Sequence, residues 1–163
     1  MNKINFLFVT LFGIGKLKKI PGSYASLATT IFLFFLFHKL NFSPNIVLIG
    51  VIIVFFISLY AVNIFIKDLD NKDPKEIVID EFIGQSIPIC LYEIAHEGAS
   101  ETGFVLTIYF VMFILFRIFD IVKPYPVSYY DKNFKNSFGV IMDDVCAGLY
   151  VVAVLVLYMV ITT

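Results

Sequence analysis

Apolar residues recur in five long stretches along the chain, separated by short polar segments. A helix that crosses a bilayer needs about 20 such residues, with a usable range of about 17–25. The third stretch is short, holds two acidic residues near its start and is interrupted by Pro88. The stretches cover approximately residues 23–40, 46–66, 77–92, 104–122 and 139–161. The pattern therefore predicts an all-α, polytopic integral membrane bundle with about five hydrophobic segments.

The residues before the first stretch predict a short helix at the membrane interface. They carry Lys3 and an apolar run over residues 4–12, followed by two glycines and a basic patch. A short amphipathic segment of this kind lies in the interface rather than across the bilayer. No small-residue cleavage site follows the run, so we do not expect a removable signal peptide.

Composition agrees with a membrane location. Hydrophobic residues make up 60% of the chain and charged residues 15%, against about 45–50% and about 25% in soluble domains. At 163 residues the chain is long enough for one domain, which we expect to span residues 1–163. Cys90 and Cys146 lack Cys-x-x-Cys spacing and are predicted to be buried thiols. No basic stripe interleaved with aromatic residues indicates a nucleic-acid partner.

The basic residues favour one orientation in the membrane. If the N-terminus is cytoplasmic and all five stretches cross, then of the 12 lysines and arginines only Lys39 lies on the far side. This is the bias of the positive-inside rule. A loop at 93–103, with three glutamates and no basic residue, also falls on the far side. So do His38 and His96, which we expect to be surface or interfacial residues. A re-entrant third stretch would invert the later segments, which the charge bias opposes.

In this topology the remaining acidic clusters lie at one depth on the cytoplasmic side. An aspartate at the centre of a span costs about 2.5–3.5 kcal/mol on insertion scales, and less near an end. Acids near helix N-termini also complement the helix dipole, which accounts for Asp80 and Asp143 but less well for Asp120, near a helix C-terminus. The clustered acids are Asp80, Glu81, Asp120, Asp131, Asp143 and Asp144.

Small residues follow two of these acids at helical spacing. Gly84 comes four residues after Asp80, and Gly148 comes four residues after Asp144. Residues four apart share one face of a helix. Two interpretations stay open, namely close helix packing through small residues and room for a cation and a lipid headgroup beside the acids.

Basic residues near the acids indicate a possible anion site. Arg117, Asp120 and Lys123 are spaced three apart, and Pro124 ends their helix. They form either an ion-pair ladder along the helix or a site for phosphate, which arginine and lysine suit. Hard oxygen ligands in this number favour Mg²⁺, which takes one or two carboxylates together with water and substrate phosphate.

A turn with the sequence Pro-Gly-Ser precedes the first long stretch. Ser23 is expected to cap the helix, and Lys19 stands just before the turn. The pattern is that of an ordinary helix N-terminus. The same N-terminus could also bind phosphate, because its first backbone N–H groups have no partner within the helix.

Taken in order, these clusters resemble the phosphatidylglycerophosphatase A family. The matching stretches are residues 19–27, 79–84, 116–126, Asp131 and 139–148. Ser23 and Ala25 stand where the family is expected to have threonine and glycine. The resemblance implies a Mg²⁺-dependent lipid phosphatase of the bacterial inner membrane. It would hydrolyse phosphatidylglycerophosphate to phosphatidylglycerol and phosphate, with its active site facing the cytoplasm and membrane lipids around it.

The hypothesis assigns a role to each motif residue. Expected metal ligands are Asp80, Glu81, Asp143 and Asp144. Expected catalytic residues are Asp120, Asp143 and Asp144. Expected substrate-binding residues are Lys19, Ser23, Arg117 and Lys123. Direct attack by water and an aspartyl-phosphate intermediate both stay open, as does the oligomeric state. The rival functions are a small transporter, whose acids would lie at several depths, and a non-catalytic membrane assembly subunit.

Overall fold

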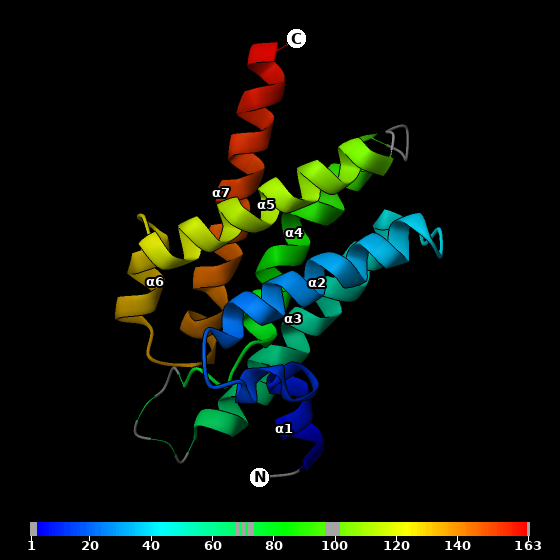
Figure 1. Cartoon of the computed structure of the whole chain (residues 1–163). Helices are drawn as coiled ribbons and strands as arrows, with labels where there is room; N and C mark the ends of the chain where they lie inside the picture. The colour runs from blue at the N-terminus through cyan, green and yellow to red at the C-terminus, as the bar shows by residue number, and fades with distance from the viewer. Residues whose placement is uncertain (1–2, 68, 70, 72–73, 97–101, 163) are drawn as a thin grey trace.

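A computed structural model describes residues 3–67, 69, 71, 74–96 and 102–162, and every regular element in these ranges is a helix (Figure 1). The elements are α1 (Lys3–Val9), the 3₁₀ segment η1 (Leu11–Lys16), α2 (Pro21–His38), α3 (Pro44–Ile66), α4 (Ile79–His96), α5 (Thr102–Val122), α6 (Val127–Asn133) and α7 (Ser137–Thr162). The all-α prediction is confirmed. Lys72, one of the basic residues predicted to be cytoplasmic, lies outside the described residues.

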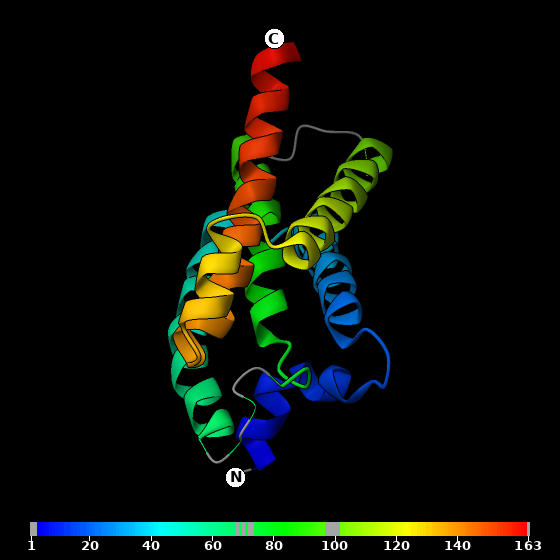
Figure 2. The ribbon, with the colours of Figure 1, turned by 90° about the vertical axis from the view of Figure 1, so that its left-hand side faces the viewer.

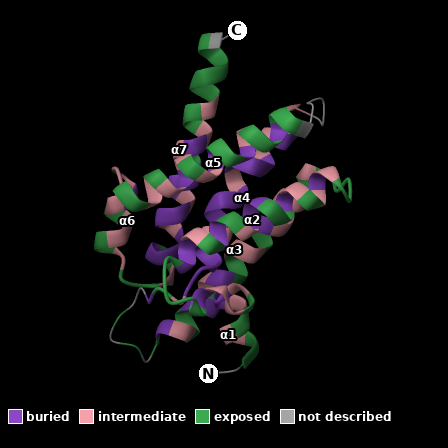
Figure 3. Cartoon of the chain, viewed as in Figure 1, coloured by how far each residue is buried: buried purple, intermediate pink, exposed green. Residues whose placement is uncertain are grey.

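Within the described residues, three helices are long and apolar enough to cross a membrane. They run over Pro44–Ile66, Gly103–Val122 and Ser137–Ile161, with mean hydropathies of 2.7, 2.3 and 2.4. The outward faces of the helices are largely exposed (Figure 3). Many of the exposed residues are large and apolar, an excess that marks contact with lipid rather than water. The chain is a membrane protein. The further crossings over α2 and α4 and the interfacial position of α1 stay predictions.

Prolines lie at the start of two helices and in the interior of a third. Pro21 and Pro44 occupy the first turns of α2 and α3, where a missing N–H costs nothing. The predicted interruption at Pro88 is wrong, because α4 continues through it to His96. Pro88 lacks the N–H that would bond to the carbonyl of Gly84, and α7 passes closely over that freed carbonyl at Gly148.

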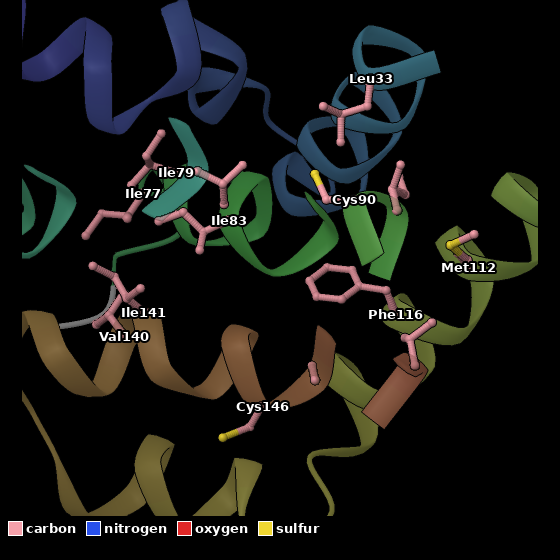
Figure 4. Packing of buried hydrophobic residues seen from close by; sticks show 14 of the residues in the cluster. Leu33, Ile77, Ile79, Ile83, Cys90, Met112, Phe116, Val140, Ile141 and Cys146 are labelled. Atoms are coloured by element: carbon pink, nitrogen blue, oxygen red, sulfur yellow. The ribbon is translucent and has the colours of Figure 1, made fainter. Parts of the chain in front are cut away.

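The bundle is built around α4. Figure 2 shows α4 in the middle, with α2 and α5 on one side and α3 on the other. α4 contacts these three helices and α7. Figure 4 shows Ile141 of α7 facing Ile83 of α4, while Phe116 of α5 points between the two helices. Cys90 and Cys146 are both buried and free, as predicted. The C-terminal part of α7 projects beyond the bundle (Figure 1).

Candidate active site

Four helix ends meet around a polar cavity of about 380 Å³. They are the N-terminal turns of α2, α4 and α7 and the C-terminal turn of α5, so residues far apart in the sequence share one site. The lining residues are Ile20, Pro21, Gly22, Ser23, Lys75, Ile77, Asp80, Glu81, Arg117, Asp120, Ile121, Lys123, Asp143 and Asp144. Every predicted site residue except Lys19 is among them; Lys19 is exposed just outside the cavity.

Three carboxylates in the cavity lie close enough to share one cation. Oxygens of Asp80, Glu81 and Asp144 all lie within 4.8 Å of one another, and Asp80 and Asp144 are only 7% and 3% exposed. Oε2 of Glu81 is buried without a hydrogen-bond partner among the described residues. An all-oxygen donor set with an unsatisfied buried oxygen fits a hard divalent ion such as Mg²⁺. Asp143, the fourth predicted ligand, does not belong to this trio.

Two glycines allow α4 and α7 to cross beside the trio. A Cβ atom at Gly84 would lie 2.5 Å from the backbone oxygen of Asp144 and 2.7 Å from the ring of Phe116. A Cβ atom at Gly148 would overlap the carbonyl oxygen of Gly84. The space beside each glycine is therefore filled by the opposing helix. Close packing is the correct interpretation of these glycines, and room for a cation and headgroup beside them is not.

The start of α2 reaches the acids through Gly22. A Cβ atom there would overlap Oε1 of Glu81 and lie 3.3 Å from a guanidinium nitrogen of Arg117. The predicted cap at Ser23 is wrong, because the N-cap is Ile20, with φ 43° and ψ 49°, and no side chain caps the helix. The reason is Pro21, which takes the first helical position and moves Ser23 into the first turn, where it lines the cavity.

Arg117 binds the acids on its own side of the cavity. Its Nη1 lies 2.8 Å from Oδ2 of Asp120 and 4.0 Å from Oε1 of Glu81, and it donates a hydrogen bond of 3.4 Å to Oγ of Ser26. Its Nε is buried without a partner among the described residues. The predicted ion-pair ladder is therefore correct for Arg117 and Asp120.

Lys123 does not pair with Asp120 as the predicted ladder requires, and instead bonds to residues of α6 and α7. It stands just after α5 with φ 47°, and its Nζ donates to Oδ1 of Asp131 at 2.7 Å and to Oδ2 of Asp143 at 2.8 Å. Burial alone would lower the pKa of Lys123, but the hydrogen bonds to Asp131 and Asp143 outweigh it and raise the pKa above its ordinary value. Lys123 thus stays charged and ties the end of α5 to α6 and α7.

Acidic groups outnumber basic ones in the cavity. Among the described residues, five carboxylates line it against the three cations Lys75, Arg117 and Lys123, which leaves two negative charges in excess when all of these groups are ionised. A phosphate monoester is itself an anion, so this excess of ionised carboxylates would oppose its binding unless a cation is added or carboxylates are protonated.

Comparison of the sequence with models of known protein families gives a match over most of the chain. A model of the phosphatidylglycerophosphatase A family matches residues 7–159. The chain belongs to this family. The resemblance noted from the motifs is thereby confirmed, and it covers all four helix ends at the cavity.

Two proteins named phosphatidylglycerophosphatase A and one differently named protein are similar to this chain over most of their length. The phosphatidylglycerophosphatase A of Haemophilus influenzae is 35% identical over 154 residues, which cover 94% of this chain and 87% of that protein. That of Escherichia coli K12 is 30% identical over 139 residues, covering 85% and 73%. A Bacteroides thetaiotaomicron protein provisionally named a phosphatidylinositol-3-phosphatase is 33% identical over 155 residues, covering 92% of each. A search of solved structures found no significant match.

Lys75 is a cavity residue that sequence reasoning treated only as a marker of orientation. It stands in the connection between α3 and α4, four residues before the first residue of α4, and is exposed. Its position just ahead of the acidic motif is the signal that could have identified it.

A second buried polar cluster lies at the opposite end of α4. Glu93 was expected in a far-side loop, but it belongs to α4 and is 4% exposed. Its Oε1 accepts a hydrogen bond from the Tyr109 hydroxyl at 2.8 Å and lies 3.2 Å from Nε2 of His38. The His38 side chain is 20% exposed, so its surface or interfacial position stays a prediction. His96 is partly buried and stacks on Tyr92, with ring centroids 4.1 Å apart. Neither histidine lines the acidic cavity.

Proposed function

We propose that this protein hydrolyses the phosphomonoester of phosphatidylglycerophosphate to give phosphatidylglycerol and inorganic phosphate. The reaction takes place at the cytoplasmic face of the bacterial inner membrane and depends on Mg²⁺. The observation that carries the proposal is the trio of Asp80, Glu81 and Asp144, with oxygens within 4.8 Å of one another, in a chain that belongs to the phosphatidylglycerophosphatase A family.

The acidic trio would hold the metal. When bound, Mg²⁺ supplies charge that offsets the carboxylates and Lewis-acid activation of the phosphoryl group. The unpartnered Oε2 of Glu81 and the excess of acids over bases in the cavity support this assignment. Asp143 keeps its contact with Lys123 and acts by fixing the first turns of α7, which carry Asp144.

Cationic and N–H groups on the other walls would hold the phosphate. The first N–H groups of a helix have no partner within the helix, so Gly22 and Ser23 offer donors to an anion, together with the Ser23 hydroxyl. Arg117, held against Asp120, places its guanidinium where negative charge grows as the phosphorus–oxygen bond breaks. Lys75 adds a second cation at the rim.

Asp120 is the proposed general base. Its carboxylate lines the cavity, and one oxygen is fixed 2.8 Å from Arg117. In this proposal the Asp120 carboxylate, which lies beside Asp144, accepts a proton from the attacking water. The leaving group is the alcohol of the glycerol headgroup, which takes up a proton as phosphate is released. A covalent alternative, with an aspartate as the nucleophile, fits the same cavity.

The test is phosphate release by the purified protein from lipid in detergent micelles. We expect phosphatidylglycerophosphate to be hydrolysed, EDTA to abolish the activity and excess Mg²⁺ to restore it. Asp120→Asn should lower turnover by about 10²–10⁴-fold. The matched control is Glu76→Gln, an acid four residues before Asp80 that does not line the cavity, which should keep the parental rate. Full activity after removal of divalent cations would exclude the metal from the reaction.

The similarity to the Bacteroides protein makes phosphatidylinositol 3-phosphate the informative second substrate. Both lipids carry a phosphomonoester on a headgroup alcohol, so the catalytic groups above would serve either. Faster turnover of the inositol lipid in the same micelles would reassign the substrate while leaving the site unchanged.

A further inference from the structure

The acidic cavity has an apolar edge. Ile20 precedes α2 and Ile121 lies in the last turn of α5; both line the cavity, yet they are 64% and 71% exposed. Part of each side chain therefore lines the cavity, and the rest is exposed on the outer surface of the protein. The other lining groups that belong to these two helices are polar or small, namely Gly22, Ser23, Arg117 and Asp120, together with Pro21.

Exposed apolar residues continue from this edge along both helices. On α2 they follow at helical spacing as Tyr24 and Leu27, which are 47% and 39% exposed. On α5 they precede Ile121 as Ile118 and Ile114, at 46% and 40%. The two helices contact each other and lie on the same side of α4 (Figure 2). The cavity thus opens onto an apolar surface that runs lengthwise along the bundle.

Ile20 has a backbone conformation that is unfavourable for isoleucine. Its φ of 43° lies in the left-handed region, where a β-branched residue is a genuine outlier and asparagine or glycine is favoured. Folding alone gives no reason for isoleucine at this position. An apolar side chain standing outward at the edge of an anionic cavity does have a use if the ligand is itself part apolar.

We propose that the lipid substrate enters the cavity sideways from the membrane, between the first turn of α2 and the last turn of α5. Its acyl chains lie along the exposed apolar surface of these helices, and its phosphomonoester reaches the acids. The occupant is an anionic phospholipid, because the apolar surface is continuous with the cavity and the cations Lys75, Arg117 and Lys123 line the cavity to meet its phosphates. This inference rests on the proposed function and adds the route and the residues that recognise the lipid part.

The first test separates recognition of the acyl chains from the chemistry. Ile20→Asn, Ile121→Asn and the double variant are compared with Ile64→Asn, an exposed residue in the last turn of α3 that does not line the cavity. Substrates are phosphatidylglycerophosphate in mixed micelles and glycerol 3-phosphate, which has no acyl chain. For the lipid we expect the double variant to raise KM at least tenfold with kcat kept within twofold. The rate on glycerol 3-phosphate and the Ile64→Asn protein should stay at parental values. An unchanged KM for the lipid overturns the proposal.

Ile20→Asn also guards against loss of folding. Asparagine tolerates the left-handed conformation better than isoleucine, so the variant should unfold at or above the parental temperature. A lower lipid affinity in a protein of undiminished thermal stability then reports on recognition.

The second test needs no turnover. A phosphatidylglycerophosphate with a diazirine in one acyl chain is photolysed with the protein in mixed micelles, and the adducts are mapped by mass spectrometry. Adducts at the α2–α5 edge that unlabelled phosphatidylglycerophosphate removes, and phosphatidylcholine does not, support the route. Adducts spread equally over the outer faces of α3 and α7, or unaffected by the competitor, overturn it. If the parental protein releases no phosphate, the proposed function fails, and the adduct map still decides the route.

Discussion

Replacing Gly84 by alanine tests whether the crossing of α4 and α7 holds the acidic trio in register. The new Cβ would lie 2.5 Å from the backbone oxygen of Asp144, whereas ordinary contact begins at 3.4 Å. The two helices must therefore separate by about 0.9 Å (3.4 − 2.5). The Phe116 ring, 2.7 Å from the same point and fully buried, blocks the other direction. Because Asp144 is itself the residue that the new Cβ contacts, and Asp80 lies one turn before Gly84, the separation opens the site.

The expected cost is small in stability and large in activity. Overpacking costs about 1–3 kcal/mol, and alanine recovers about 1 kcal/mol of helix propensity. The free energy of unfolding should therefore fall by roughly 0–2 kcal/mol. A displacement of about 1 Å at a reacting centre costs on the order of 10²-fold in rate. We expect Gly84→Ala to lose about that much turnover and to need more Mg²⁺ for half-maximal activity.

The assay is phosphate release from phosphatidylglycerophosphate across a Mg²⁺ titration, with thermal unfolding in the same detergent. Gly50→Ala is the matched control, because it lies within α3 and its added Cβ has nothing within 4 Å. It should gain about 0.5–1 kcal/mol and keep its activity. A Gly84→Ala protein with the parental rate and Mg²⁺ requirement would refute the link between helix separation and the site.

Three further predictions concern other parts of the molecule. Tyr109→Phe removes the hydrogen bond to buried Glu93 and should lower the free energy of unfolding by about 1.5–3 kcal/mol, with turnover per folded molecule unchanged. A fall in turnover would contradict the view that the Glu93 cluster plays no part in the reaction at the acidic cavity. Lys123→Met leaves two acids without their cation, and it should lower the unfolding temperature and the activity together; an unchanged unfolding temperature would argue against the tie between α5, α6 and α7. In a cysteine-free background, Lys132→Cys should react with an impermeant maleimide only after the cytoplasm is opened, and Asn45→Cys should react from outside; labelling of both from one side would contradict the proposed orientation.

The helices were predictable because their signals are local. The five apolar stretches follow from hydrophobic length alone, and each became one helix with its start and end within a few residues of the prediction. The errors arose where a neighbour decides the outcome. Pro88 was expected to interrupt α4, but α4 is packed on several sides, and the loss of one helical hydrogen bond there is outweighed by tertiary contacts.

The gathering of the acids was predictable because they lie near the ends of successive helices. Helices that alternate in direction return to one face, and acids near those ends must meet in a small bundle. The pairing within that cluster was not predictable. Lys123 was expected to act with Arg117 along one helix face, yet it turns toward α6 and α7 because α5 ends before it and its backbone takes a left-handed conformation. Such a partner depends on how far a lysine reaches in space rather than on spacing in the sequence.

The two buried acidic regions of α4 differ in a way that separates structure from function. At the far end, Glu93 is a single carboxylate whose Oε1 accepts a hydrogen bond from Tyr109 and lies 3.2 Å from Nε2 of His38. At the other end, three carboxylates crowd together while one buried oxygen has no donor among the described residues. Burial of like charges without full pairing opposes folding, so this arrangement is a stability cost that Glu93 does not carry. A divalent cation would reverse that cost, and by linkage it would stabilise the fold as it binds. The Glu93 carboxylate has hydrogen-bond partners at one end of α4, whereas the acidic trio at the other end is incompletely paired. This difference is a physical reason to place the chemistry at the first turns of α2, α4 and α7.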